Sequence, residues 1–189
     1  MADARVVPLS KALLEPLAAH LKRHTAESGR DGDRVFMPFE PGTDQGPSGI
    51  DPARWQLPLT QPGWQRWFVA LSSEVSPEAR VVGHLDLKGE ALPTARHRCE
   101  LGIGIERAYR GAGLGRTLMQ RGIDFARAAP ELDWLDLRVF RHNAPARALY
   151  EALGFTLLGM VPDRVRVAGQ KIDDCLMTLP VSPEIDPRG

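Results

Sequence analysis

The chain has little that would tie it to a charged partner, a membrane or an oxidising compartment. Its 189 residues carry 24 Lys and Arg against 24 Asp and Glu, so no net charge favours nucleic acid or an anionic membrane surface. No apolar run approaches the roughly 20 residues that a membrane-spanning helix needs, and the N-terminal segment lacks the apolar stretch of a signal peptide. We therefore expect a cytoplasmic protein with no nucleic-acid and no membrane partner.

Cysteine is also scarce. Cys99 and Cys175 are the only two, and each lies in a β-like run. Neither belongs to a CxxC pair or to a Cys/His cluster with zinc spacing, so no metal site is expected. Two buried, reduced thiols are the simpler interpretation for a cytosolic protein.

The length fits one domain, since domains typically run about 100–200 residues. We expect this domain to span residues 1–180, with a flexible tail over 181–189. Within it, residues 29–63 are rich in Gly and Pro, so regular structure there should be short, with one helical turn near 51–56. Because this segment carries Phe36, Phe39 and Trp55, we interpret it as a packed lid.

The hydrophobic pattern of the rest predicts an α/β architecture. Strands are expected at 5–9, 67–71, 80–88, 99–105 and 135–140, and a hairpin at 155–167 and 174–179 that turns over 168–170. Helices are expected after Ser10 as N-cap, at 113–128, and at 146–153 with Gly154 ending the last one. This order predicts a sheet of mixed strand direction.

The most specific local pattern is the segment ELGIGIERAYRGAGLGRTLM, in which a strand leads through a Gly-rich turn directly into a helix. A helix start leaves N–H groups unpaired and carries positive potential. Gly111, Gly113 and Gly115 let an anion approach, and Arg110 adds a fixed charge. The pattern predicts a pyrophosphate site, with a plain strand–turn–helix corner as the alternative. It lacks the lysine of a P-loop, and Arg116 breaks a G-x-G-x-x-G fingerprint.

Two motifs resemble the GNAT N-acetyltransferase family over about residues 66–180. The family's [Arg/Gln]-x-x-Gly-x-[Gly/Ala] pattern is filled by Arg110, Gly113 and Gly115. Its Asn-x-x-Ala-x-x-Leu-Tyr-x-x-x-Gly-Phe pattern is filled by Asn143, Ala146, Leu149, Tyr150, Gly154 and Phe155. The strand between them matches the family's Leu-x-Leu-x-Val at Leu135, Leu137 and Val139.

The resemblance implies an acetyl-CoA-dependent N-acetyltransferase without a metal. It also implies the GNAT fold, a mostly antiparallel sheet of about seven strands whose middle strands splay, flanked by helices. The pantetheine arm would pair with the splayed strand, where Gly102 and Gly104 indicate a bulge or a close backbone approach. The implied cofactor-binding residues are Ile103, Ile105, Arg110, Gly111, Ala112, Gly113, Leu114, Gly115, Arg116 and Asn143. Asn143 is equally well read as a helix N-cap.

By resemblance, Tyr150 gives a proton to the departing CoA thiolate, and a core aromatic is the alternative. The amine must also lose a proton, and Glu100 is our first candidate for that base, directly or through water, against an ordinary solvated carboxylate. Weaker candidates for the base are His84, Asp86, Asp136 and Asp174. The remaining histidines, which are His20, His24, His97 and His142, are expected on the surface.

The acceptor is expected to be a primary amine, a small molecule in preference to a protein, and a homodimer is left open. Glu40 and Asp44 of the lid would attract a cationic amine. Two alternatives remain: a non-catalytic acyl-CoA-binding or sensing module on the same fold, and a transferase that acts on a protein N-terminus or lysine.

Overall fold

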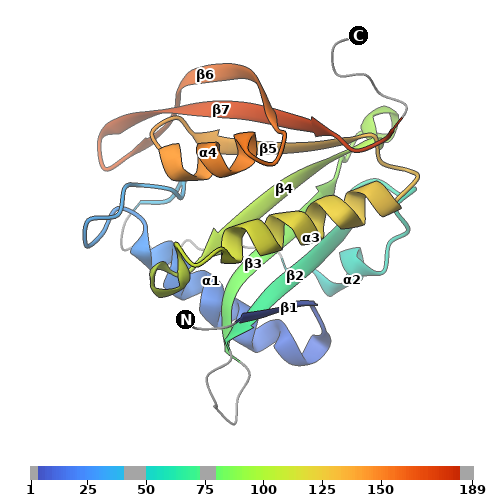
Figure 1. Cartoon of the computed structure of the whole chain (residues 1–189), viewed down its shortest axis with the longest axis horizontal. Coiled ribbons are helices and arrows are strands. Elements are labelled where there is room, and N and C mark those ends of the chain that lie inside the picture. Colours follow the sequence, from blue (N-terminus) through green and yellow to red (C-terminus); the bar gives the residue numbers. More distant parts are fainter. Residues whose placement is uncertain (1–3, 41–49, 73–79, 184–189) are drawn as a thin grey trace.

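The computed structural model describes residues 4–40, 50–72 and 80–183. Its centre is one seven-stranded sheet in the order β1-β2-β3-β4-β5-β7-β6 (Figure 1). The strands are β1 (Ala4–Pro8), β2 (Gln65–Ser72), β3 (Val81–Gly89), β4 (Arg98–Ile105), β5 (Trp134–Phe140), β6 (Thr156–Val167) and β7 (Gln170–Pro180). Neighbouring strands run antiparallel except β4 and β5, which are parallel. The predicted mixed, mostly antiparallel sheet is therefore confirmed.

Helices cover both faces of this sheet. They are α1 (Leu14–Glu27), α2 (Pro52–Trp55), α3 (Leu114–Ala128) and α4 (Ala144–Glu151), with 3₁₀ turns η1 (Lys11–Leu13), η2 (Pro93–Ala95) and η3 (Arg107–Tyr109). Trp67 of β2 packs with Leu17 of α1, whereas the next residue, Phe68, packs with Leu118 of α3. Because successive strand residues point to opposite faces, α1 and α3 lie on opposite sides of the sheet.

The core side of α3 is the one that the sequence predicted. Its buried residues are Leu114, Leu118, Met119, Gly122, Ile123 and Ala126, which recur at helical spacing. Burial of each large apolar side chain contributes about 1.5–3 kcal/mol, so packing against the sheet holds this helix in place. The helix begins at Leu114 because Gly113 before it has φ 86°, a left-handed conformation that interrupts the helical path.

The starts of α1 and β7 differ from prediction. The hydroxyl of Ser10 makes no capping hydrogen bond, and η1 separates it from α1. Pro16 consequently falls in the first turn of α1, where the missing N–H removes no helical bond. The hairpin between β6 and β7 turns on only Ala168 and Gly169, which both have positive φ, so β7 begins at Gln170 and not at Asp174. The part of the expected tail from residue 184 on lies outside the described residues.

The middle of the sheet is split between β4 and β5. Their pairing covers only Arg98–Leu101 and Trp134–Leu137, although β4 continues to Ile105 and β5 to Phe140. Figure 1 shows β5, β7 and β6 turning away from β4 beyond this point. The splay implied by the resemblance is thus present.

In the described parts of the chain, none of the helices combines the length and the apolar character that crossing a membrane requires.

Candidate functional site

The turn between β4 and α3 is open and exposed at its two left-handed glycines. Gly111 has φ 79° and Gly113 has φ 86°, and a Cβ at either position would meet no atom within 4 Å. Gly115 serves a different purpose, because a Cβ added at this position would lie 3.2 Å from Leu149 and 3.4 Å from Ile105. Glycine therefore shapes the turn at the first two positions and allows α3 to pack closely at the third.

The N–H groups of this turn converge at the start of α3. Among the described residues, none of the N–H groups from Gly111 to Arg116 donates to a carbonyl, and the first bond back to the turn runs from Thr117 N–H to Gly113 O, at 3.1 Å. Unpaired N–H groups at the positive end of a 15-residue helix make an anion site. The structure thus brings together the predicted positions 111–116.

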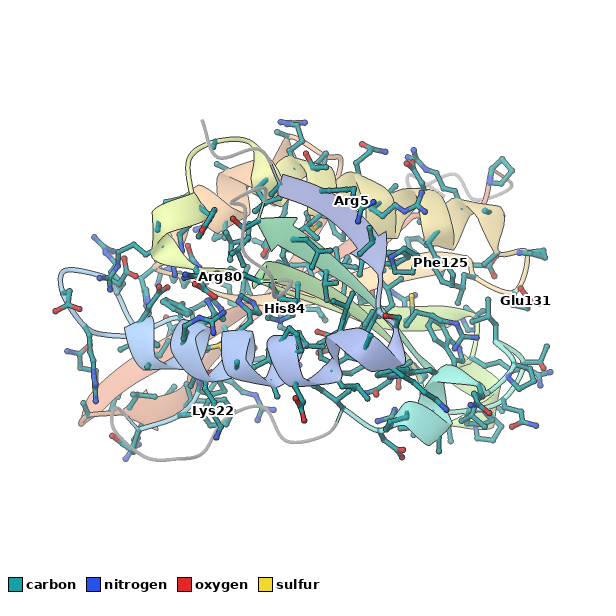
Figure 2. The ribbon with its side chains drawn as sticks, turned by 90° about the horizontal axis from the view of Figure 1, so that it is seen from below. Arg5, Lys22, Arg80, His84, Phe125 and Glu131 are labelled. Atoms are coloured by element: carbon teal, nitrogen blue, oxygen red, sulfur yellow. The ribbon has the colours of Figure 1, made fainter. Side chains whose placement is uncertain are left out.

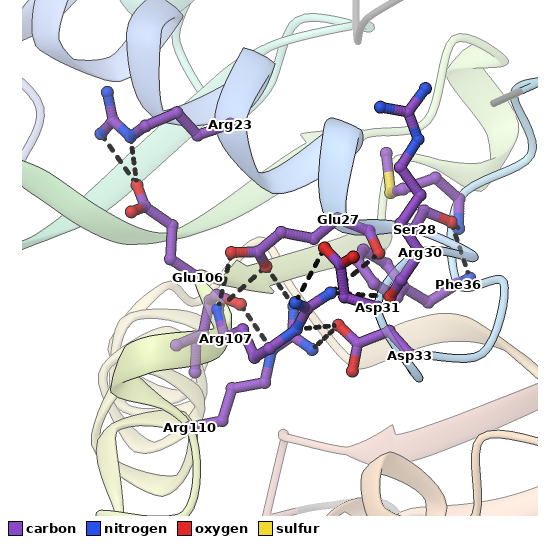
Figure 3. A network of polar contacts seen from close by, with 12 residues as sticks. Arg23, Glu27, Ser28, Arg30, Asp31, Asp33, Phe36, Glu106, Arg107 and Arg110 are labelled. Atoms are coloured by element: carbon purple, nitrogen blue, oxygen red, sulfur yellow. Dashed lines mark hydrogen bonds and ion pairs between the residues drawn. The ribbon is translucent and has the colours of Figure 1, made fainter. Parts of the chain in front are cut away.

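The side chain of Arg110 is directed elsewhere. Its guanidinium lies 2.7 Å from Asp33 Oδ2 and 2.6 Å from Glu27 Oε2, and its Nε donates to the Ile105 carbonyl at 2.8 Å (Figure 3). It also stacks 4.9 Å from the ring centre of Phe36. The charge that the sequence analysis assigned to the pyrophosphate is therefore neutralised by two carboxylates, and Arg110 joins α1, the start of the lid and the end of β4.

Beyond the pairing with β5, one edge of β4 faces the split. Glu106 N–H donates to Val82 O at 3.0 Å. Bonded residues alternate along an antiparallel ladder, so Gly104 and Gly102 also direct their backbone groups to β3. Ile103 and Ile105 consequently direct theirs toward β5, as an added extended chain would require. The Ile105 carbonyl already accepts from Arg110.

Gly102 and Gly104 make room for polar side chains on the α1 face. Gly104 pairs with His84 and Gly102 with Asp86 across the β3–β4 ladder. A Cβ on Gly104 would overlap His84 Cε1 and His24 Nε2, and one on Gly102 would overlap Asp86 Oδ1. These glycines therefore permit a close approach of side chains, and β4 pairs with β3 in regular register without a bulge at this point.

Tyr150 and Asn143 lie at opposite ends of α4. Tyr150 is 6% exposed, and burial raises the pKa of its phenol to about 12, so the phenol is a neutral proton donor. Within the described residues its hydroxyl makes no hydrogen bond. The side-chain oxygen of Asn143 accepts a hydrogen bond from Ala146 N–H at 3.4 Å, which confirms that Asn143 is the N-cap of α4. This bond does not involve the amide N–H₂ group of Asn143.

Among the acidic candidates, Glu100 is the one whose carboxylate makes no hydrogen bond or ion pair to another described residue. It is exposed and lies between Lys88 of β3 and Asp136 of β5. Partial burial raises its pKa, while Lys88 and Arg138 oppose that shift.

The other acidic candidates are held by cations. Asp136 accepts two hydrogen bonds from Arg98, at 2.6 and 2.7 Å, and Arg138 lies 2.6 Å from Asp174. Asp86 is buried, which raises its pKa, and its Oδ2 lies 3.0 Å from Lys88.

The prediction that His20 and His24 lie on the surface is wrong, since they are 0% and 5% exposed. Both occupy the side of α1 that carries Leu17 and Leu21, and this helical spacing was the signal in the sequence. His97 and His142 are half-buried. Burial, followed by the charges of His20 and Arg110, lowers the pKa of His24 to about 3.

His20 joins two groups from distant parts of the chain. Its Nδ1 lies 2.9 Å from Glu106 Oε1, and its Nε2 lies 2.9 Å from His84 Nδ1. Arg23 and Arg80 also bind the Glu106 carboxylate, at 2.8 and 3.1 Å. No group of three or more His, Cys, Asp or Glu side chains in the described ranges is arranged to hold a metal ion.

The described part of the lid bridges the two parts of the sheet. Ser28 Oγ accepts from the N–H groups of Phe36 and Met37, at 3.0 Å each, which fixes the start of the lid beside α1. At the other side, Glu40 accepts from Ala168 N–H of the β6–β7 turn at 3.0 Å. Phe39 is half-buried, and Trp55 packs in the cluster of Leu17 and Leu21. Asp44 lies outside the described residues.

Comparisons with known proteins agree with this geometry. A family model described as "Acetyltransferase (GNAT) family" matches residues 38–155. The L-amino acid N-acetyltransferase AaaT of Escherichia coli is 28% identical over 106 residues, which cover 56% of this chain and 62% of that protein.

Two solved structures share the fold. An acetyltransferase of the GNAT family from Streptococcus pneumoniae superposes with a TM-score of 0.78 at 21% identity, covering 95% of this chain and 99% of that one. The yncA acetyltransferase of Salmonella typhimurium, solved with acetyl-CoA, gives a TM-score of 0.74 at 19% identity over 98% of both chains.

Proposed function

Since the chain belongs to the acetyltransferase (GNAT) family, we propose that it transfers an acetyl group from acetyl-CoA to a primary amine, by direct attack within a ternary complex. The observation that carries this proposal is the pairing of an open anion site at Gly111–Arg116 with an uncovered strand edge at Ile103 and Ile105. Pyrophosphate and pantetheine need these two features side by side. The Salmonella neighbour, solved with acetyl-CoA, supports the choice of cofactor.

In this proposal the N–H groups of Gly111–Arg116 bind the pyrophosphate, and the backbone of Ile103 and Ile105 pairs with the pantetheine arm. The free amide end of Asn143 is available to the same arm. The N–H near Ile105 polarises the thioester carbonyl. Holding both reactants in line supplies a large part of the rate, because attack becomes intramolecular.

Proton transfer is assigned to two side chains. Tyr150 donates to the sulfur as the carbon–sulfur bond breaks, and its raised pKa keeps it protonated until then. Glu100, exposed and unpaired within the described residues, takes a proton from the incoming ammonium, directly or through water. Both cysteines are buried, and burial raises the pKa of Cys99 to about 12, which supports direct attack over an acyl-cysteine intermediate.

The acceptor is proposed to be a small primary amine. AaaT is named for L-amino acids, which are acceptors of this class. The charges of Lys88, Glu100 and Arg138 lie on the face of β3, β4 and β5 that would receive the amine. Glu100 would attract the ammonium, whereas Lys88 and Arg138 are already paired with Asp86 and Asp174.

A panel of primary amines with acetyl-CoA, read by release of free thiol and by the mass of the acetylated product, tests the proposal. We expect thiol release only with an amine that gains one acetyl group. A non-catalytic acyl-CoA-binding module would instead show a higher melting temperature with acetyl-CoA and no thiol release with any amine. Activity with peptides alone would move the acceptor to proteins.

A further inference from the structure

With the His20 ring neutral, the hydrogen bonds among Glu106, His20 and His84 fix the tautomers of both imidazoles. A carboxylate only accepts, so His20 Nδ1 carries the hydrogen of the 2.9 Å contact with Glu106. In the neutral ring His20 Nε2 then has the lone pair, and it accepts from His84 Nδ1–H at 2.9 Å. His84 Nε2 is left with a free lone pair, and it has no partner within the described residues.

His84 lies where this lone pair would be useful. Its ring stands over Gly104, in the part of β4 that runs on after the pairing with β5 ends, and 8% of the residue remains exposed. Figure 2 shows His84 and Arg80 beside α1, on the face of the sheet that this helix covers. A side chain at position 104 would close the space that the imidazole occupies.

We propose that Glu106, His20 and His84 form a proton relay, and that His84 Nε2 accepts the second proton that the acceptor nitrogen loses during acetyl transfer. The relay rests on the proposed function, because it serves the same reaction. His84 is then a catalytic residue, and His20 and Glu106 are positioning residues that act through it.

The protons balance as follows. An ammonium becomes an amide by losing two protons, and Glu100 takes the first, which frees the lone pair. The new nitrogen–carbon bond gives a tetrahedral adduct with a cationic nitrogen, and His84 Nε2 takes its proton while Tyr150 protonates the departing sulfur. Of the two protons removed, one restores Tyr150 through solvent and the other is released, so the products are amide, CoA thiol and one proton.

The surroundings of His84 favour a transient acceptor. When Nε2 gains a proton, the hydrogen on Nδ1 passes to His20, and the positive charge comes to rest beside the Glu106 carboxylate. Hydrogen bonds from His20, Arg23 and Arg80 overcome the effect of burial and lower the pKa of Glu106 to about 2, so this carboxylate stays ionised.

His84 itself is surrounded by groups that resist lasting protonation. Burial lowers its pKa well below 6.5, and His20 and His24 of α1 and Lys88 of β3 add to that effect. Asp86 is the acidic neighbour two residues along β3, and it is paired with Lys88. His84 Nε2 therefore stays unprotonated at neutral pH, and protonation of His84 should lower the rate only as the pH drops below the ordinary histidine range.

The first test compares His84→Gln with His97→Gln, the same change at a half-buried histidine outside the cluster. His84→Gln should lower kcat about 10²-fold, as loss of general base help does, and leave the rise in melting temperature with acetyl-CoA unchanged. His97→Gln should match the parent. Glu106→Gln should move the acid limb of the kcat profile to lower pH, because the cation loses its carboxylate. A purely structural role would lower the melting temperature without moving that limb.

The second test is chemical rescue of His84→Ala. Imidazole should restore activity in the cavity left by the ring, and pyrazole, which has the same shape and is far less basic, should not. Equal rescue by both, or a kcat of His84→Gln equal to that of His97→Gln, overturns the relay and leaves the transferase proposal standing. A parent protein that acetylates no amine defeats the transferase proposal itself, and the relay with it.

Discussion

The buried His24 makes the stability of the fold depend on pH in a calculable way. Its pKa is about 3 in the folded protein and 6.5 in the unfolded chain. As the pH falls below 6.5, the unfolded chain binds a proton that the folded protein refuses, so the free energy of unfolding decreases. The stability that comes from keeping His24 neutral is fully present above pH 6.5 and is lost progressively as the pH falls from 6.5 to 3.

Between pH 7.5 and 5.5 the unfolded chain gains almost one proton at this position. The expected loss is about 1.4 kcal/mol, the free energy of one pKa unit. For a domain of this length, that corresponds to a fall in melting temperature of about 3–6 °C. His84, whose pKa burial also lowers, adds a loss of the same sign, whereas Asp86, whose pKa burial raises, opposes it.

His24→Phe isolates the contribution of His24, because it keeps a ring to stack on Phe36 and removes the titrating nitrogens. Melting curves recorded at pH 7.5 and 5.5 should show that the free energy of unfolding decreases more in the parent than in the variant, by about 1.4 kcal/mol. In the control variant His97→Gln, which replaces a half-buried histidine, the free energy of unfolding should decrease as much as in the parent. An equal decrease in the free energy of unfolding in His24→Phe and in the parent would refute the assignment of His24 as a buried neutral histidine.

Three further substitutions test the packing and the site. Gly104→Ala should cost about 1–3 kcal/mol by overpacking against the histidines, whereas Gly159→Ala, which meets no atom, should be neutral in denaturant unfolding. Tyr150→Phe should lower kcat by about 10²–10⁴-fold with acetyl-CoA affinity retained, and a kcat within about twofold of the parent, where chemistry limits the rate, would remove Tyr150 as the acid. Gly113→Val should abolish the rise in melting temperature with acetyl-CoA, whereas Gly169→Val, with a similar positive φ elsewhere, should keep it.

Much of the fold was predictable because apolar periodicity reflects the local surroundings of each element. The buried side of α3 follows directly from the spacing of Leu114, Leu118 and Ile123. The split between β4 and β5 came only from the resemblance, since strand pairing joins residues far apart in the chain. The start of β7 was missed because Lys171 and Asp173, in a hairpin that continues past the core, are polar.

The candidate site was predicted less completely for a similar reason. The Gly-rich turn is a local pattern, and the structure brings its residues together as expected. The partners of Arg110 are not local, because Glu27 and Asp33 precede it by 83 and 77 residues. His20 and His24 were placed on the surface by residue type, although their spacing from Leu17 and Leu21 indicated the buried side of α1.

The most direct test of the account follows a labelled acetyl group. The protein is incubated with acetyl-CoA carrying a ¹³C-labelled acetyl group and an amine that supports thiol release, and the masses of the amine and of the intact protein are recorded together. Direct transfer predicts one labelled acetyl on the amine for each CoA thiol released, with no labelled protein at any time. Labelled acetate in place of labelled amide, or a transient acetylated protein, would contradict it.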